Sequence, residues 1–454
     1  MRWVAALVVT LLVPACMPAD ERPNPPPPTP TRVTDAAEIT TRPLVLAMNA
    51  RRPPIDVPEA VAEWIQQGVI TNWRDLGQPA APLRGIRPAA PLRVVDRTDS
   101  LRHLPMDTIA LVVADAMQPS ARAITVAGVD PLRDPDDYPL QVVGPAHPPV
   151  TTMTVVGDVM LGRRVTGRPV LVPTARRLAS ADLTVGNLES TLSDHGAATQ
   201  DDAFHAPRSA RAALRQAGFD ALSLANNHVG DYGDRALVET VRLLHAAGLR
   251  PFGAGRDLAQ ARSPVVISRH GIRFGFLAFN AIGETPAAAP GRPGALSVSM
   301  PPRTGPLDHA ELERVLADVR RLSRRVDVVT VMPHWGRQYT NRPEPAQRVV
   351  ARALARAGAD LVVGGHPHWV QGASMVGDAL VVNSLGNFVF DMDTMRETQE
   401  GLMLEATFWG DRLVAAEFVP YRIDAAFAPR VLPVASAAHT FDLFWEFSGL
   451  AATR

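Results

Sequence analysis

The sequence predicts an α/β fold built from two units that follow an exported N-terminus. Short apolar runs of strand length alternate with amphipathic segments of helical period, which is typical of layered α/β folds. The 454 residues exceed what one core usually encloses, so two domains are expected. The composition, with 46% hydrophobic and 20% charged residues, is that of a globular protein.

The charge balance excludes one broad class of partner. Lysine and arginine together number 46, aspartate and glutamate also number 46, and the formal net charge is zero. Nucleic-acid-binding proteins normally carry a basic surface, so no nucleic-acid partner is expected. All of the lysine-plus-arginine total is arginine, which is typical of coding bias in a GC-rich bacterial genome.

Residues 1–15 have the pattern of a signal peptide. Arg2 precedes an apolar run at residues 4–13 that is too short to span a bilayer. Residues 13–16, Val-Pro-Ala-Cys, resemble a bacterial lipobox, in which Cys16 becomes the first mature residue and carries lipid. The alternative is a plain signal peptide with an incidental cysteine. We expect an exported protein, lipid-anchored to the outer face of a bacterial cell membrane.

Residues 16–40 form a lipid-attachment and linker segment, and residues 41–148 form the first unit. The proline-rich run at 24–30 favours an extended polyproline II spacer. The expected elements of the unit are strands at residues 43–48 and 109–114 and a helix at 58–67 with Val61, Trp64 and Ile65 on one face.

Part of the first unit resembles the phosphate-type periplasmic solute-binding proteins. The resemblance rests on Gly-Val-Ile-Thr-Asn-Trp-Arg-Asp-Leu-Gly at residues 68–77 and on residues 123–130. A complete binding protein has two lobes, whereas this unit has the length of one. It is therefore either a remnant binding lobe or a structural or partner-docking domain, and we favour the second because pockets usually need walls from both lobes.

Residues 149–425 form the second unit, and residues 426–454 form a tail. Its apolar and amphipathic segments alternate throughout. The expected strands are 153–156, 219–224, 274–279, 326–332, 361–363 and 380–382. The expected helices are 209–217, 308–323 and 345–357, a helix face marked by Leu237, Val241 and Leu244, and a short helix at 441–447 in the tail.

Polar side chains of the second unit follow the predicted strands at the points where those strands end. The segments are Gly-Asp-Val-Met-Leu-Gly-Arg at 157–163, Gly-Asn-Leu-Glu at 186–189, Asn-Asn-His at 226–228, Pro-His-Trp-Gly at 333–336 and Gly-Gly-His-Pro-His at 364–368. In α/β sheets, ligands bind beyond the carboxyl ends of the strands. A mixed set of carboxylate, amide and imidazole groups suits Mn²⁺, Fe or Zn²⁺ rather than Ca²⁺. One such histidine would be unremarkable, but five segments in order predict a site.

The order of these segments resembles the calcineurin-like metallophosphatase fold and, within it, the CapA family of capsule and poly-γ-glutamate synthesis proteins. Asp-Tyr-Gly at 231–233 and Ser-Leu-Gly-Asn-Phe at 384–388 add to the resemblance, which covers nearly all of the second unit. It implies a metallophosphatase sandwich with a smaller N-terminal α/β domain and one or two divalent metal ions.

The resemblance also implies roles for single residues. The implied ligands are Asp158 and His368 for one metal position, and Asn227, His334 and His366 for the other. Glu189 is similar in place to the carboxylate that bridges both positions, with Asn187 close behind it. His228 would be the general acid that protonates the leaving group. Two cations about 4 Å apart repel each other, and a carboxylate between them offsets the repulsion.

Two departures from the family pattern affect the predicted site. Met160 stands where phosphatases of this fold have a ligand histidine, and Gln338 stands where the family usually has glutamate. Other roles remain open. Arg163 could bind a substrate carboxylate or phosphate, or pair with a local acid. Asn387 and Asp391 could orient a ligand histidine or cap a turn.

Three functions remain open. The first is a metal-dependent hydrolase or transferase of the cell envelope that acts on an anionic polymer or its precursor, which the ligand set favours. The second is a non-enzymatic component of polymer export or attachment, acting with other envelope-synthesis proteins. Met160 and the resemblance of the first unit to a solute-binding lobe favour it. The third is a phosphoesterase, because the fold allows it although fold alone does not decide function.

Overall fold

The computed structural model describes residues 39–83, 94 and 101–452. The predicted signal peptide, Cys16 and the proline-rich run lie outside these residues, so their assignments stay predictions. Residues Ile39–Arg454 belong to one compact unit. Among the described helices, none is both long enough and apolar enough to cross a membrane.

A small antiparallel sheet opens the described chain. β1 (Ile39–Asn49) pairs with β3 (Ile109–Val113), β4 (Ala121–Ala123) and β6 (Gln141–Pro145). β2 (Asp56–Val57) pairs separately with β5 (Thr125–Val126). The predicted strands and helix of this region are therefore present, whereas its resemblance to a solute-binding lobe stays a prediction.

Both faces of β1 are buried. Successive side chains of a strand point to opposite faces. On one face, Leu46 belongs to a core that includes α1 (Glu59–Gln66). On the other, Val45 belongs to a second core that includes Trp409 and Val414 from the C-terminal part of the chain. The N-terminal sheet is thus packed directly onto the rest of the protein.

Two residues that were predicted to share the apolar face of α1 differ in their burial. Ile65 is buried, but Trp64 is 47% exposed. Trp73, in the 3-10 turn Trp73–Leu76, is fully buried in this core instead, and the guanidinium of Arg52 lies 3.5 Å from its ring centre. Helical spacing showed an apolar face but could not tell which tryptophan fills the core.

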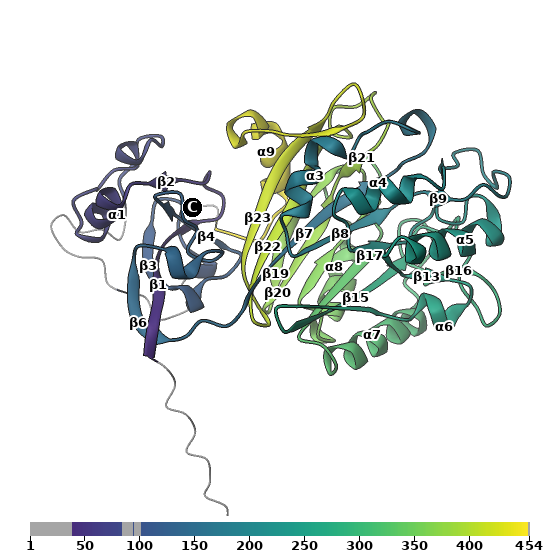
Figure 1. Ribbon diagram of the computed structural model, residues 1–454, viewed down its shortest axis with the longest axis horizontal. Coiled ribbons are helices and arrows are strands. Elements are labelled where there is room, and N and C mark those ends of the chain that lie inside the picture. The colour runs from purple at the N-terminus through teal and green to yellow at the C-terminus, as the bar shows by residue number, and fades with distance from the viewer. Residues whose placement is uncertain (1–38, 84–93, 95–100, 453–454) are drawn as a thin grey trace, which may run out of the picture. The chain divides into compact units, whose positions relative to one another are not determined.

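Two larger sheets make up the body of the protein (Figure 1). In the described part of the chain, the first contains β7 (Val150–Val159), β8 (Leu183–Leu188), β11 (Ala221–Ser223), β12 (Arg250–Phe252), β21 (Asn387–Val389), β22 (Glu400–Trp409), β23 (Arg412–Ile423) and β24 (Pro429–Val431). The second contains β14 (Val265–Arg269), β15 (Ile272–Asn280), β17 (Val328–His334), β18 (Leu361–Val363), β19 (Val370–Val376) and β20 (Ala379–Leu385).

Helices cover the outer faces of the two sheets. Val155 of the first sheet and Phe276 of the second belong to one apolar core between them. A second core joins the first sheet to the helices α3 (Val172–Ala179), α4 (Ala210–Gln216) and α5 (Gly233–Ala246). A third joins the second sheet to α7 (His309–Ser323) and α8 (Pro345–Arg356). The predicted α/β sandwich is confirmed.

The remaining elements are short. They are α6 (Leu258–Ala261), α9 (Ala438–Glu446), and the strand pairs β9 (Thr191–Leu192) with β10 (His205–Ala206) and β13 (Ala254–Gly255) with β16 (Gly294–Ala295). α9 lies close to β19, as expected for a tail helix packed on the body.

Parallel pairing brings distant loops to one edge of each sheet. β7, β8, β11 and β12 run parallel, as do β15, β17, β18 and β20. The carboxyl ends of parallel strands meet at the same edge, where ligands bind in open α/β sheets. The polar segments identified in the sequence therefore gather at these strand ends.

A buried glutamate links the N-terminal sheet to the body. Glu405 of β22 is 7% exposed, and its carboxylate lies 2.9 Å from Arg133 and 2.5 Å from Arg177. Burial by itself raises the pKa of Glu405. The hydrogen bond from Arg177 and the charge of Arg133 lower the pKa by more than burial raises it, so the pKa is below its ordinary value. Trp409 Nε1 also donates to the carbonyl of Leu132 at 2.8 Å.

We expect Glu405→Gln to destabilise the protein at neutral pH. The lost charge-assisted hydrogen bonds are worth roughly 1.5–3 kcal/mol. Because the folded pKa is lowered, this stability is present above the unfolded pKa of about 4.3 and is lost as pH falls through the folded value. Urea unfolding should therefore show a deficit at pH 7 that shrinks in acid. Glu313→Gln, which removes an exposed partner of Arg320, is the control and should cost under about 1 kcal/mol.

Candidate metal centre

Strand pairing places several of the predicted metal-site residues next to one another. Asp158 on β7 is opposite Asn187 on β8, and the Asn187 amide donates to Asp158 Oδ1 at 2.9 Å. His334, the last residue of β17, forms a bridge with Gly365. A Cβ on Gly365 would lie 2.6 Å from Asp158 Oδ1 and 3.0 Å from His334 Nδ1. Glycine is therefore needed for this close approach.

Two ligand candidates come from the loop after β18. His366 and His368 are buried and have φ angles of 94° and 60°, which is uncommon outside glycine. The backbone N–H of His366 donates to Asp158 Oδ2 at 3.0 Å and so ties the loop to the end of β7. Strained backbone of this kind clusters at functional sites.

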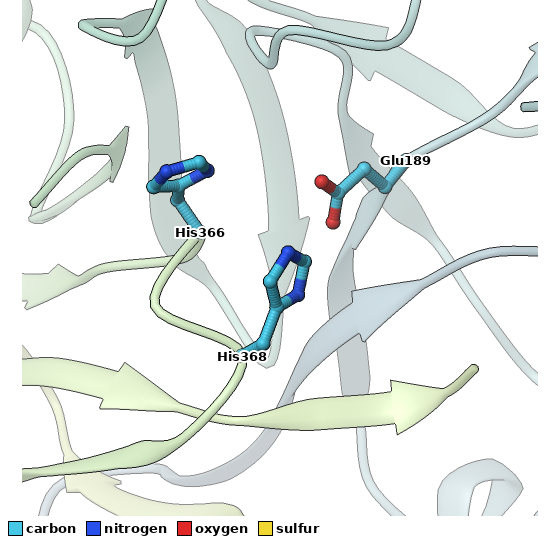
Figure 2. A group of neighbouring side chains, drawn as sticks. All are labelled: Glu189, His366 and His368. Carbon is cyan, nitrogen blue, oxygen red and sulfur yellow. The ribbon is translucent and has the colours of Figure 1, made fainter. Parts of the chain in front are cut away.

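Glu189 and His366 carry buried polar atoms that lack hydrogen-bond partners among the described residues. Both carboxylate oxygens of Glu189, just after β8, are unpartnered, and so are both ring nitrogens of His366. Leaving such groups unpaired in a protein interior is costly. Glu189, His366 and His368 each offer a ligand atom within 4.8 Å of the others, and Figure 2 shows the three side chains bordering a common space. This donor set fits a divalent metal ion.

The other predicted ligands adjoin this group. Asn227 Oδ1 lies 2.9 Å from His334 Nε2, which in turn lies 3.5 Å from Glu189 Oε1. The ring centres of His334 and His366 are 5.1 Å apart. On the other side, His368 Nδ1 lies 3.8 Å from Asp158 Oδ2. The structure thus brings together Asp158, Glu189, Asn227, His334, His366 and His368.

Burial dominates the charge states at the site. It raises the pKa of Asp158 to about 7 and also raises the pKa of Glu189. It lowers the pKa of His334 to about 4 and the pKa of His366 well below its ordinary value. The imidazoles are therefore neutral, as metal ligands must be. A divalent cation would supply the positive charge that the buried carboxylates lack.

His228 is held by the carboxylate of Asp231, which is part of the Asp-Tyr-Gly motif quoted from the sequence but was given no role there. Its Nδ1 lies 2.8 Å from Asp231 Oδ2, and its ring stacks on Phe204 with centres 3.6 Å apart. Burial by itself lowers the pKa of His228. The hydrogen bond with Asp231 and the charges of nearby acids raise the pKa by more than burial lowers it, so the net shift is upward. Its Nε2 lies 3.9 Å from Glu189 Oε1, at the edge of the ligand group. The three-residue spacing of His228 and Asp231 was the available signal.

Asn387 orients His368, one of the candidate ligand histidines. His368 Nδ1 donates to Asn387 Oδ1 at 2.8 Å, and the Asn387 amide donates to the carbonyl of Thr398 at 3.1 Å. The second bond fixes which end of the amide faces the histidine. The Nε2 lone pair of His368 is then the one available to a metal.

Arg163 is paired with acids in this structure. Its guanidinium contacts Asp391 through two nitrogens and Asp202 at 2.6 Å. The guanidinium carbon also lies 4.6 Å from the ring centre of Phe204. Of the two roles open in the sequence, local pairing is the one the geometry displays, and Asp391 is engaged by this pair rather than by a ligand histidine.

Met160 contributes no ligand to the site. Its side chain is fully buried in the apolar core beneath α3 and α4, and its sulfur accepts from the backbone N–H of Gly162 at 3.1 Å. The position served by Asp158 and His368 therefore lacks the donor that a histidine would bring.

The arrangement can hold a metal ion beside a proton donor. The metal would supply Lewis acidity that polarises a substrate oxygen and stabilises negative charge formed in the reaction. The chain itself would bind that metal through buried carboxylate, amide and imidazole groups, and would hold a proton at His228 Nε2. Such a pairing suits hydrolysis or transfer at an acyl or phosphoryl centre.

A family profile and two similar proteins point to the same family. The profile described as bacterial capsule synthesis protein PGA_cap matches residues 152–392. Capsule biosynthesis protein CapA of Bacillus anthracis is 31% identical over 299 residues, which cover 63% of this chain and 70% of the relative. PGA biosynthesis protein CapA of Bacillus subtilis is 29% identical over 266 residues, which cover 56% and 67%.

A solved structure described as a novel phosphatase from Mycoplasma pneumoniae overlaps 65% of this chain and all of its own, at 10% identity and a TM-score of 0.38. The family rests instead on the profile match, which spans more than half of the chain and contains all six ligand candidates. By that match, the chain belongs to the bacterial capsule synthesis protein (PGA_cap) family.

Proposed function

We propose that this protein is a metal-dependent hydrolase or transferase of the cell envelope, acting on an anionic polymer or its precursor in capsule or poly-γ-glutamate-type synthesis. The observation that carries the activity is the group of buried, unpartnered donors around Glu189 and His366. The names of the two Bacillus relatives, capsule biosynthesis protein and PGA biosynthesis protein, support the choice of polymer.

The chain's own residues would divide the work in a simple way. Glu189 and the histidines would hold the metal, the Glu189 carboxylate would offset its charge, and Asn387 would orient His368. Asp231 holds His228 through Nδ1, so that Nε2 carries the proton for a leaving group. The ring of Phe204 stacked on His228 limits its rotation and excludes water from one face.

A substrate panel with metal analysis tests the proposal. The purified protein should contain a divalent metal, measured by mass spectrometry, and should turn over γ-glutamyl amide or ester substrates faster than phosphoesters. Chelation should abolish turnover, and Mn²⁺, Fe²⁺ or Zn²⁺ should restore it. Preferential turnover of phosphoesters would replace this proposal with a phosphoesterase.

A non-enzymatic role in polymer export or attachment is the second candidate. The inward-turned thioether of Met160 favours it, because one metal position then has fewer donors than a two-metal hydrolase needs. In that case the protein would bind the anionic polymer and a metal ion but would turn over none of the panel.

We also propose that the protein is exported and anchored through lipid on Cys16. Cys16→Ser should move it from the membrane fraction to the medium or periplasm, because it removes the acyl chains on which the proposed anchoring depends. Fractionation followed by detergent partitioning measures the change. A variant that partitions like the wild type would show that Cys16 carries no anchor.

A further inference from the structure

Gln338 lies against the metal-facing atom of His368. Its amide nitrogen is 3.4 Å from His368 Nε2, although the residue is on a different loop, four positions after the end of β17. That loop is tied to the histidine loop by Trp335 N–H to Gly365 O at 3.1 Å and by Tyr339 N–H to Pro367 O at 2.9 Å. Gln338 is therefore held between two fixed points and is half-buried.

The contact identifies which atom of His368 the amide meets. The Nδ1 proton of His368 is donated to Asn387, so Nε2 carries the lone pair. In this structure the Gln338 amide donates to that lone pair. A metal ion held by His368 would occupy the same lone pair, and the amide would lose its acceptor.

A flip of the Gln338 side-chain amide would place its oxygen, instead of its nitrogen, next to the metal. The oxygen and nitrogen of a glutamine amide are nearly equal in size, and rotation about the last side-chain torsion is soft. Turning exchanges Nε2 for Oε1 at the same place, so an acceptor replaces a donor next to His368. An amide oxygen is a carbonyl ligand, and carbonyl ligands suit cations such as Mn²⁺.

The same metal position is short of donors. Asp158, His368 and Glu189 serve it, and Met160 has turned its sulfur toward Gly162. The other position already includes one neutral amide, that of Asn227. We propose that Gln338 Oε1 is the fourth protein donor of the position served by Asp158 and His368, in the place that Met160 leaves open.

Metal titration of the full chain tests this directly. The protein is stripped with chelator and titrated with Mn²⁺ by calorimetry, for the wild type, Gln338→Leu and Gln338→Glu. We expect two affinity classes in the wild type. Gln338→Leu should weaken only the weaker class, by roughly 10- to 100-fold, the scale seen when groups around a metal are removed. Gln338→Glu should tighten that class, because a carboxylate adds negative charge.

Arg337→Ala is the matched control, since Arg337 is the exposed neighbour of Gln338 and pairs with Glu344 at 2.9 Å. It should leave both classes unchanged, and thermal unfolding of the metal-free variants should match the wild type. The proposal is overturned if Gln338→Leu leaves Mn²⁺ affinity unaltered, or if neither class responds to Gln338→Glu.

The inference rests on the proposed metal centre but not on its catalytic activity. A protein that turns over no substrate, yet loses Mn²⁺ affinity in Gln338→Leu, would support the ligand role and count against the hydrolase. An active enzyme with unaltered affinity but a higher KM in Gln338→Leu would overturn the ligand role and make the amide a substrate contact.

Discussion

His228→Ala is expected to lower turnover by roughly 10²- to 10⁴-fold, the usual scale for loss of a general acid. Metal content should stay the same, because His228 Nδ1 is engaged by Asp231 and its Nε2 is 3.9 Å from Glu189. The loss should shrink for substrates with good leaving groups, which need no proton. Steady-state kinetics on a series of leaving groups measures this dependence.

Asp231→Asn is the companion variant for that experiment. It removes the charge that holds His228, while the amide can still accept from the backbone N–H of Phe204 as Asp231 does at 2.7 Å. A smaller loss with the same leaving-group trend would mark Asp231 as a positioning residue. An equal loss for good and poor leaving groups in His228→Ala, with reduced thermal stability, would mean that His228 only shapes its loop.

His366→Ala is expected to strip the tightly bound metal, whereas His368→Ala should mainly reduce activity. The predicted position of Asn227, His334, His366 and Glu189 would have four protein donors, and these residues lie close together. The other predicted position would depend on Asp158, His368 and Glu189, with the half-buried loop amide of Gln338 as the proposed further donor. Metal analysis after gel filtration should therefore show most metal lost only in His366→Ala.

His270→Ala is the control for the metal analysis, because His270 is an exposed histidine that bonds the carbonyl of Val150 far from the ligand group. It should retain the wild-type metal content. Equal and stable occupancy of both positions in the wild type, with equal loss in the two ligand variants, would contradict the assignment.

Much of the fold could be predicted because its core strands are short, apolar and bounded by turns. The runs at residues 274–279 and 361–363 became β15 and β18 with little change. β22 and β23 were not predicted. All ten residues of β22 are buried, including Glu400 and Glu405, so it lacks the polar–apolar alternation that marks a half-buried strand. Glu405 is paired with Arg133 and Arg177, which are both more than two hundred residues away in sequence.

The gathering of the candidate ligands could be predicted because parallel strands bring their carboxyl ends to one edge, whatever the loops between them. Roles that depend on loop conformation could not. Gln338 reaches His368 only because the loops are tied together through Tyr339 and Pro367. Arg163 could not be assigned because Asp391 is more than two hundred residues away in sequence. A local pattern contains no information on such pairings.

The two-sided burial of β1 limits how this protein can be divided. A fragment ending near residue 148 would keep the core around Leu46 but would uncover the face that Val45 shares with Trp409 and Val414. An apolar face left open to water favours self-association. A recombinant form of the protein should therefore keep both the N-terminal sheet and the C-terminal strands. A natural rearrangement that moved the N-terminal sheet to another protein would also need a new cover for that face.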